Sequence, residues 1–386
     1  MKMQLIYLLT LLGMAAGTLG LTAADSLAKE ERKTSVAPEA AQDGSVRVSA
    51  FDLPLSGLLS AETRAALKRQ TEEFKEWEKV CPVSWAHLTS PQDVAVLRQC
   101  EEKYFYPPII ARQRARYKVA IQPETIAGVA TEIITPVGGV SDANRHRVLI
   151  NLHGGGFVVG GRSEGQMESI PIAAVGQIKV ISVDYRMAPE YRFPAASEDA
   201  AAVYKALLGQ YKPEDIGIYG CSAGGLLTAE AVAWFQKQGL PAPGAIGMFC
   251  GAAYGFDNND SGHMAAALAG SHATLPEKLS YFRDVNSEDP LAYPGLAPQM
   301  MARFPDSLLI TSTRDQAMSS VVVTHAQLVR LGVKAELHVW EGLGHAFFFE
   351  SDLPESREAY EVIAHFFDEH LGGKRAGIAA AEAQRR

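Results

Sequence analysis

Short apolar runs alternate with longer, helix-like segments over most of the chain between residues 132 and 371. The runs Val148–Leu152, Lys179–Val183 and Ser307–Thr311 have the length of buried strands. The segment Leu226–Gln238 is rich in Leu, Ala and Val, which is typical of a helix. Since no linker-like break interrupts this alternation, the pattern predicts a single domain of the α/β class.

Two amphipathic segments precede this region and are predicted to be helices. In Ala61–Cys81 apolar residues recur at helical steps, and Pro91–Phe105 repeats the pattern. These apolar positions are Leu67, Phe74, Trp77 and Cys81 in the first segment and Val94, Leu97 and Tyr104 in the second. Such helices either pack on a central sheet as structural elements or cover a pocket, and the spacing alone does not decide between the two.

The start of the chain has the pattern of an export signal. Lys2 supplies a positive charge, Leu5–Leu12 is almost wholly apolar, and Thr22–Ala24 offers small residues for cleavage. Because the apolar stretch is short for a membrane span, residues 1–24 are predicted to be a signal peptide, with an uncleaved N-terminal anchor as the alternative. Residues 25–48 are polar with Pro and Ala, which predicts a flexible linker. We therefore expect an exported protein, periplasmic or extracellular, without a stable membrane anchor.

Composition narrows the chemistry that the domain can support. The chain has 386 residues, and 47% of them are hydrophobic, enough for one well-packed core. Its formal net charge of −8 argues against nucleic acid or an anionic membrane as a partner. The sequence has no Cys-x-x-Cys or His-Glu-x-x-His pattern and no dinucleotide-binding fingerprint, so we expect no metal and no cofactor. The predicted partner is a small molecule.

The strongest local signal for chemistry is Gly220–Gly224 (Gly-Cys-Ser-Ala-Gly), which directly follows the apolar run Ile216–Tyr219. A serine between two glycines after a strand is the pattern of a nucleophile elbow, a tight turn into a helix that exposes the hydroxyl of Ser222. The glycines suit a turn in which backbone segments approach too closely for a β-carbon. The alternative is a chance pentapeptide in a glycine-rich loop.

A second glycine-rich segment, His153–Gly156, follows the first of the predicted strands. Three successive glycines leave backbone N–H groups unscreened by side chains, as an oxyanion hole requires. We assign the amides of Gly154, Gly155 and Ala223 as the donors of that hole, and we expect His153 to order the loop through hydrogen bonds. For a triple glycine by itself, a flexible turn is the competing interpretation.

A general base must come from a histidine that can reach Ser222. The segment Ala335–Trp340 alternates like a strand and is followed by a glycine-flanked loop that ends at His345. Functional groups in parallel sheets collect beyond the carboxyl ends of the strands, so His345 is the predicted base. His263 and His272 lie in an irregular segment and are weaker rivals. The histidines better explained by packing or by a surface position are His338, His365 and His370.

The same reasoning about strand ends selects an acid. Asp315 follows the predicted strand Ser307–Thr311, whereas Asp306 precedes it and would lie at the opposite edge. With Asp315 the chain order is serine, acid, histidine, the order expected after an elbow of this type. In such a triad the carboxylate orients the histidine and stabilises its charged form. A surface turn residue is the alternative interpretation of Asp315, with Glu341 as the substitute acid.

Together these motifs resemble those of the hormone-sensitive-lipase-like (bacterial class IV) carboxylesterases. The resemblance covers residues 124–371. The matching segments are His153–Gly156, Asp184–Glu190, Phe193–Pro194 with Glu198–Asp199, the elbow Gly220–Gly225, and Gly344–Phe347. The resemblance implies an α/β-hydrolase fold, with a mostly parallel central sheet, helices on both faces and a helical cap. The implied domains are a cap region at 49–120 and a catalytic domain at 121–372, followed by a polar tail at 373–386.

The resemblance also implies a function. The expected protein is a serine esterase that hydrolyses short- to medium-chain carboxylic esters through an acyl-enzyme. Its triad would be Ser222, Asp315 and His345, with the oxyanion donors named above, and part of 255–291 would complete the cap. An amidase or peptidase would use the same triad. An inactive hydrolase scaffold that only binds a ligand is a further alternative.

The four cysteines fall into two groups. Cys81 and Cys100 lie in one predicted helical region and, because export permits disulfides, they are the candidate pair. Cys221 and Cys250 fall at the ends of core strands and are expected to be free thiols.

Two further polar pairs lie near the predicted site. Tyr185 and Arg186 follow a predicted strand and are expected to brace the site without acting in the chemistry. Glu198 and Asp199 begin the predicted helix Ala200–Leu208, and we expect these acids to cap its N-terminus.

Overall fold

The structure is a computed structural model that describes residues 39–48, 52–256, 259–269 and 275–372. The predicted signal peptide, the polar tail, His272 and most of the predicted linker lie outside these residues. Within the linker, β1 (Glu39–Ala40) pairs antiparallel with β2 (Val46–Arg47). This hairpin belongs to one compact unit of the chain, Met1–Pro54, and the elements described below belong to a second, Leu55–Arg386.

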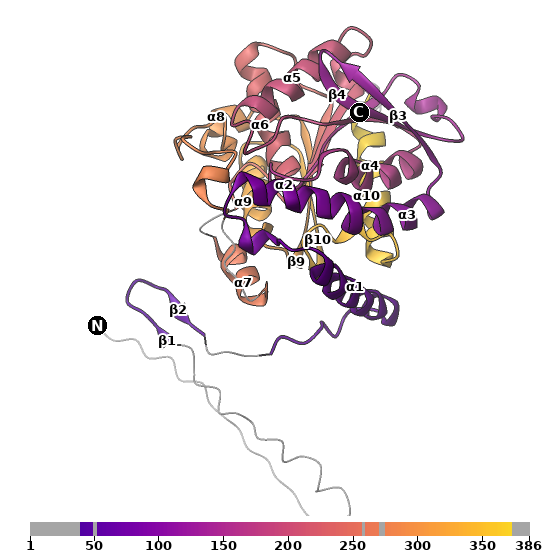
Figure 1. Cartoon of the computed structure of the whole chain (residues 1–386). Helices are drawn as coiled ribbons and strands as arrows, with labels where there is room; N and C mark the ends of the chain where they lie inside the picture. Colours follow the sequence, from indigo (N-terminus) through magenta and orange to yellow (C-terminus); the bar gives the residue numbers. More distant parts are fainter. Residues whose placement is uncertain (1–38, 49–51, 257–258, 270–274, 373–386) are drawn as a thin grey trace, which may run out of the picture. The chain divides into compact units, whose positions relative to one another are not determined.

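One sheet of eight strands, all within the described residues, organises the second unit (Figure 1). Its strand order is β10-β9-β8-β7-β5-β6-β4-β3. The neighbours from β10 to β6 are parallel, and β4 and β3 form an antiparallel edge. The strands are β3 (Val119–Ile126), β4 (Val129–Pro136), β5 (Val148–Leu152), β6 (Lys179–Val183), β7 (Ile216–Cys221), β8 (Ala245–Phe249), β9 (Asp306–Arg314) and β10 (Ala335–Gly344). The predicted α/β class with a mostly parallel sheet is confirmed.

Three helices precede the sheet: α1 (Ala61–Val80), α2 (Pro91–Cys100) and α3 (Tyr106–Arg116). α2 begins with a capping box and continues into α3 through a π-helical turn, Glu101–Phe105. A disulfide joins Cys81, just after α1, to Cys100 at the end of α2, so the candidate pair is bonded. The remaining helices are α4 (Gly161–Gly176), α5 (Ala195–Leu207), α6 (Ala223–Gln238), α7 (Asp260–Ala269), α8 (Pro298–Met301), α9 (Met318–Arg330) and α10 (Pro354–His370).

Successive strand residues face opposite sides of the sheet, and each side buries its own apolar cluster. Ile150 and Leu152 belong to one cluster together with side chains of α5 and α6. Leu149, which directly precedes Ile150 in the chain, belongs to the other cluster together with side chains of α4 and α10. Helices therefore cover both faces of the sheet (Figure 1). Burial on both faces explains why β7 and β8 contain no charged residue.

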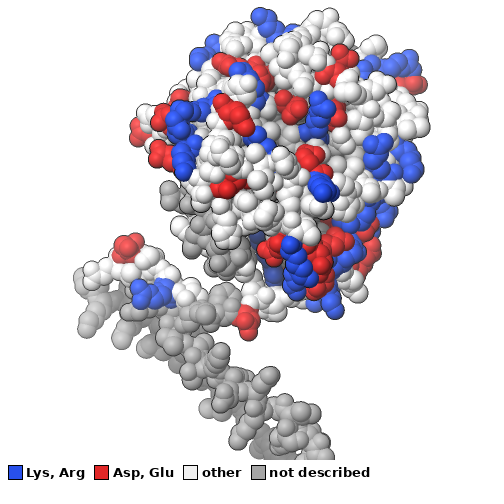
Figure 2. Space-filling model, in the orientation of Figure 1, with Lys and Arg blue, Asp and Glu red and all other residues white. Residues whose placement is uncertain are grey.

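Ion pairs tie α1 and α3 to the C-terminal part of the unit. Arg112 of α3 lies 2.8 Å from Glu350 and 3.2 Å from Glu73 of α1. Arg69 of α1 lies 3.1 Å from Asp352. Figure 2 shows charged side chains of both signs gathered in the region of α1. Glu350 is almost fully buried, and its pairing with Arg112 compensates a carboxylate charge that would be costly to bury without a partner.

Several predicted boundaries differ from the observed ones. β10 continues past Trp340 to Gly344, with an irregular register against β9, so His345 follows the strand directly. α5 begins at Ala195 rather than at Ala200. Phe74 and Tyr104, predicted to lie on the apolar stripes of their helices, are 49% and 42% exposed, and Tyr104 lies in the π-helical turn, which interrupts the regular helical spacing. No helix in the described part of the chain is long and apolar enough to cross a bilayer.

Candidate active site

The elbow lies where β7 ends and α6 begins. Ser222 has a left-handed φ of 57°, which brings the backbone sharply round between the strand and the helix. The flanking glycines are required by close backbone approach, because a β-carbon at Gly220 or Gly224 would lie 2.1 Å or 1.8 Å from the carbonyl oxygen of Leu152. The amide of Ser222 donates to the carbonyl of Phe249 on β8, so pairing with the neighbouring strand holds the turn.

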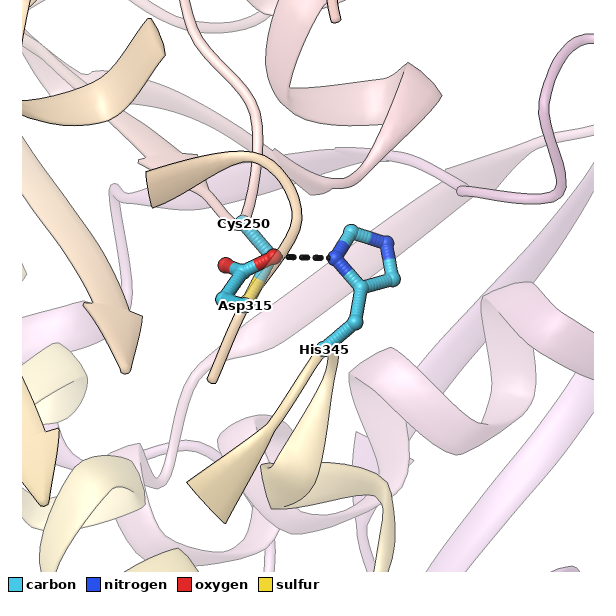
Figure 3. A group of neighbouring side chains, drawn as sticks. All are labelled: Cys250, Asp315 and His345. Carbon is cyan, nitrogen blue, oxygen red and sulfur yellow. Dashed lines mark hydrogen bonds and ion pairs between the residues drawn. The ribbon is translucent and has the colours of Figure 1, made fainter. Parts of the chain in front are cut away.

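The structure brings Ser222, His345 and Asp315 together from the ends of three strands. Nε2 of His345 lies 2.8 Å from Oγ of Ser222. Nδ1 of the same ring lies 2.6 Å from Oδ1 of Asp315, as Figure 3 shows. His345 follows β10, and Asp315 follows β9. These side chains therefore meet at the carboxyl edge of the sheet, where the sequence analysis expects them.

Asp315 is 1% exposed and accepts hydrogen bonds from several groups. The hydroxyl of Thr311 donates to Oδ2 at 2.7 Å, and the amide of Ala317 donates to Oδ1 at 2.8 Å. Burial by itself would raise the pKa of Asp315, but the nearby His345 ring and these hydrogen bonds together lower it below its ordinary value. The carboxylate is thus kept ionised next to the imidazole.

His153 supports the glycine loop, which we define as His153–Gly156, and takes no part in the serine–histidine contact. Its ring is fully buried and stacks on Tyr185 with centroids 4.1 Å apart, and Nδ1 lies 2.9 Å from the carbonyl oxygen of Gly154. The hydroxyl of Tyr185 donates to the carbonyl of His153 at 2.6 Å. Burial lowers the pKa of His153 to about 4, so the ring is neutral at neutral pH.

The amide of Gly154 is engaged inside the protein. It donates to Oε1 of Glu168 at 2.8 Å, and Nδ2 of Asn151 donates to Oε2 of the same carboxyl at 2.7 Å. The expectation that Gly154 supplies an oxyanion donor is therefore inconsistent with this geometry, because one N–H cannot serve a buried carboxyl and a substrate oxygen at the same time. Among the described residues, the amides of Gly155, Gly156 and Ala223 have no hydrogen-bond acceptor.

Two buried acids of α4, Glu164 and Glu168, lie beneath the glycine loop and are not among the site residues predicted from the sequence. Burial raises the pKa of Glu168 to about 8 and that of Glu164 well above its ordinary value. A β-carbon on Gly154 would lie 2.4 Å from Oε1 of Glu164, so the loop backbone packs directly on that carboxyl. The available signal was a pair of glutamates one helical turn apart, just after the glycines.

The two thiols outside the disulfide are buried next to this site. Burial raises the pKa of Cys250 to about 11 and that of Cys221 well above its ordinary value, so both stay protonated. The amide of Ala346 donates to Sγ of Cys250 at 3.4 Å.

Within the described residues, Cys250, Asp315 and His345 form the one group with metal-ligand atoms inside 4.8 Å of one another (Figure 3). A cation there would have to replace the hydrogen bond between Asp315 and His345.

The rival residues lie elsewhere. Glu341 is exposed, and Asp306 lies 2.6 Å from His370 at the opposite edge of the sheet. His263 is exposed on α7, and His272 lies outside the described residues. His338 is near Glu336 on β10, and His365 is near Glu369 on α10.

Arg186 and Asp199 form a brace that the sequence analysis assigned differently. Asp199 does not cap α5, because the helix begins before it. Instead, Asp199 accepts hydrogen bonds from the amide and from Nε of Arg186, each at 2.9 Å. Glu198 binds the same guanidinium at 3.0 Å. Neither acid makes a side-chain cap hydrogen bond, so the capping prediction is wrong, although Glu198 does lie in the first turn of α5. The bracing role expected for Arg186 agrees with the contacts.

Comparisons with known proteins find similar chains. A family model described as α/β hydrolase fold matches residues 149–349. An acetyl-hydrolase of Streptomyces hygroscopicus is 26% identical over 225 residues, which cover 57% of this chain and 75% of that protein. The crystal structure of an esterase, E25, matches with a TM-score of 0.73 at 25% identity and covers 85% of this chain and 99% of that chain. The crystal structure of an esterase from the bacterial hormone-sensitive lipase family matches with a TM-score of 0.67 at 25% identity and covers 81% and 99%.

Proposed function

Since the chain belongs to the α/β-hydrolase family and is a carboxylic ester hydrolase similar to bacterial hormone-sensitive-lipase esterases, we propose that it hydrolyses its substrate through an acyl-enzyme on Ser222. The observation that carries the proposal is the continuous series of hydrogen-bond contacts from Oγ of Ser222 through His345 to Asp315. A serine hydroxyl is a weak nucleophile, and it needs an adjacent base that is itself held in place.

In the proposed reaction His345 moves protons and Asp315 holds the ring. Nε2 of His345 takes the proton of Ser222 while Oγ bonds to the ester carbonyl carbon. The ring then gives that proton to the departing alkoxide, and the carbon–oxygen bond to the alcohol breaks. Water attacks the acyl-enzyme in the same way, its proton passes through His345 back to Ser222, and the carboxylic acid is released.

The negative charge on the carbonyl oxygen needs donors that are already in place. We assign this role to the amides of Gly155, Gly156 and Ala223, since all of these lack an acceptor among the described residues while Gly154 is bound to Glu168. Left-handed φ values of 84° and 58° at Gly155 and Gly156 support the assignment, because glycine adopts this conformation without strain.

For the substrate we propose esters with short to medium acyl chains. Support comes from the resemblance of the sequence motifs and from the acetyl-hydrolase among the relatives.

We further propose that the protein is exported. Support comes from the signal-like pattern of residues 1–24 and from the disulfide between Cys81 and Cys100, a bond that persists in oxidising compartments. Cell fractionation with N-terminal sequencing of the mature protein tests this. Cytosolic enzyme that keeps Met1 would contradict it.

The test of the mechanism is Ser222→Ala, measured with p-nitrophenyl butyrate and with a fluorophosphonate probe. Loss of the nucleophile should lower kcat by about 10⁶-fold and abolish labelling, with an unchanged melting temperature. The matched control is Ser287→Ala, which removes an exposed serine and should keep both activities. Wild-type turnover in Ser222→Ala, or a wild-type protein that hydrolyses esters without taking up the probe, would overturn the acyl-enzyme.

A further inference from the structure

The disulfide between Cys81 and Cys100 closes a loop, residues 81–100, that packs on the main core. We call this segment the disulfide loop. Its residues Leu88, Val94 and Leu97 are at most 2% exposed. They share one apolar cluster with Phe157, Val158 and Val159, which directly follow the glycine loop. The disulfide loop is therefore part of the wall behind the glycine loop.

Side chains of the disulfide loop also touch the backbone around the glycine loop. A β-carbon on Gly156 would lie 2.9 Å from Cη2 and 3.1 Å from Cζ3 of Trp85, so the indole rests on the α-carbon of Gly156. Arg98 donates from Nε to the carbonyl of Val158 and from Nη2 to the carbonyl of Ala188, each at 2.6 Å. The backbone that follows Gly156 is thus held from the side of the disulfide loop.

The indole of Trp85 is held in a fixed orientation. Its Nε1 donates to Oε1 of Glu101 at 3.3 Å, and the hydroxyl of Tyr106 donates to Oε2 of the same carboxyl at 3.0 Å. Glu101 is 5% exposed and begins the π-helical turn, a feature that often occurs at functional sites. Because Glu101 directly follows Cys100, the disulfide keeps Trp85 and its anchor in the same part of the molecule.

We infer that Trp85 is a specificity-determining residue, whose indole forms the wall beside Gly156 and limits the size of the ester group that binds there. The inference rests on the proposed function, in which the amide of Gly156 binds the carbonyl oxygen. A substituent on that carbonyl carbon then lies within reach of the ring. Trp85 retains 37% of its accessible surface, so the indole is available to a ligand, and its flat apolar face suits an alkyl or aryl group.

The test compares two ester series in the wild type and in Trp85→Ala. One series lengthens the acyl chain from acetate to decanoate with p-nitrophenol as the leaving group, and the other enlarges the alcohol with acetate as the acyl group. Removing the indole should raise kcat/KM for the largest ester relative to the smallest by about tenfold or more in one series. The series that responds identifies the group that faces Trp85.

Two further variants give matched comparisons. Trp85→Phe keeps a smaller ring without the N–H for Glu101 and should shift the same ratio by a smaller factor. Tyr104→Ala removes an aromatic side chain of the π-helical turn that is exposed to a similar degree, and its ratio should stay at the wild-type value. Reduction of the disulfide should shift the ratio in the same direction as Trp85→Ala, because the indole then loses its restraint.

The outcomes separate this inference from the proposed function. Suppose that Trp85→Ala folds, is still labelled at Ser222 by the fluorophosphonate probe, and has an unchanged ratio in both series. That result would overturn the inference that Trp85 limits ester size, and the acyl-enzyme proposal would stand. If Trp85→Ala does not fold, Trp85→Phe becomes the test. A wild-type ratio in Trp85→Phe would overturn the inference about Trp85 in the same way. Loss of labelling in the wild type would instead overturn the proposed function.

Discussion

The carboxyl edge of the sheet and the disulfide loop hold their key side chains by different means. At the sheet edge, Ser222, Asp315 and His345 directly follow parallel strands: β7 and β9 are paired on both sides, and β10 is an outer strand paired with β9. In the disulfide loop, Trp85 depends on one hydrogen bond to Glu101 and on a covalent cross-link. Reacting groups in this molecule are thus placed by the backbone, and the proposed specificity residue is placed by side chains.

The difference has a physical reason. Positions of atoms that react must be held within fractions of an ångström, and paired strands with close backbone contacts provide that rigidity. A wall that only limits ligand size tolerates more movement, so side-chain contacts are sufficient. We therefore expect substitutions at the sheet edge to affect rate strongly, and substitutions in the disulfide loop to affect stability and ester preference.

After loss of the nucleophile Ser222 itself, the largest expected effect is that of Asp315→Asn on kcat. The neutral amide cannot stabilise the charged ring as a carboxylate does, and its NH2 can donate to Nδ1 and hold the ring in the wrong tautomer, so kcat should fall by about 10⁴-fold. Steady-state kinetics with p-nitrophenyl butyrate and a melting curve would measure this. Glu341→Gln, at the exposed rival acid, is the control and should stay within about twofold of the wild type. Equal losses in the two variants would contradict the assignment of Asp315.

The disulfide should matter for stability far more than for the reaction. Replacing Cys81 and Cys100 together by serine frees the chain between them, and the free energy of unfolding should fall by about 3 kcal/mol. Turnover of p-nitrophenyl acetate should remain within about threefold, because the sheet edge is untouched. Urea unfolding with and without reductant measures the effect. A double variant that is as stable as the wild type would contradict the expectation that the disulfide loop contributes mainly to stability.

Glu168, beneath the glycine loop, leads to a prediction of how stability depends on pH. Burial raises the pKa of Glu168 to about 8, so the folded state keeps a proton that the unfolded state loses above pH about 4.3. Its contribution to stability is therefore full at low pH and is lost as pH rises through this window. Between pH 5 and pH 7, the free energy of unfolding of Glu168→Gln should fall by about 2 kcal/mol less than that of the wild type. Parallel stability curves for the two proteins would contradict the prediction.

The smallest expected effect is that of Arg98→Lys. Lysine cannot donate to the carbonyls of Val158 and Ala188 in the planar arrangement of a guanidinium, so the free energy of unfolding should fall by about 1 kcal/mol. The control is Arg145→Lys, at an exposed pair with Asp142, where no change is expected. Chemical denaturation of the two variants side by side would show whether the disulfide loop is held as proposed.

Much of the sheet edge could be predicted from the sequence. Elbow glycines, apolar strand runs and loops that start with Asp315 or end at His345 are local patterns, and a parallel sheet brings the ends of its strands to one edge. The predicted strand β5 and the start of β10 agree with the observed residues for this reason. The contacts of the disulfide loop could not be predicted in this way, because helical spacing in Pro91–Phe105 does not indicate which element the helix packs against.

The sequence by itself determined the fold class, the order of the strands along the chain and the segments that carry Ser222, Asp315 and His345. Only the tertiary structure decided that Gly154 donates to Glu168, that Asp199 binds Arg186 rather than capping α5, and that Trp85 lies on Gly156. The reason is that spacing along the chain controls backbone conformation and burial, which are local. Contacts between side chains far apart in sequence depend on how the completed elements pack, and no single segment contains that information.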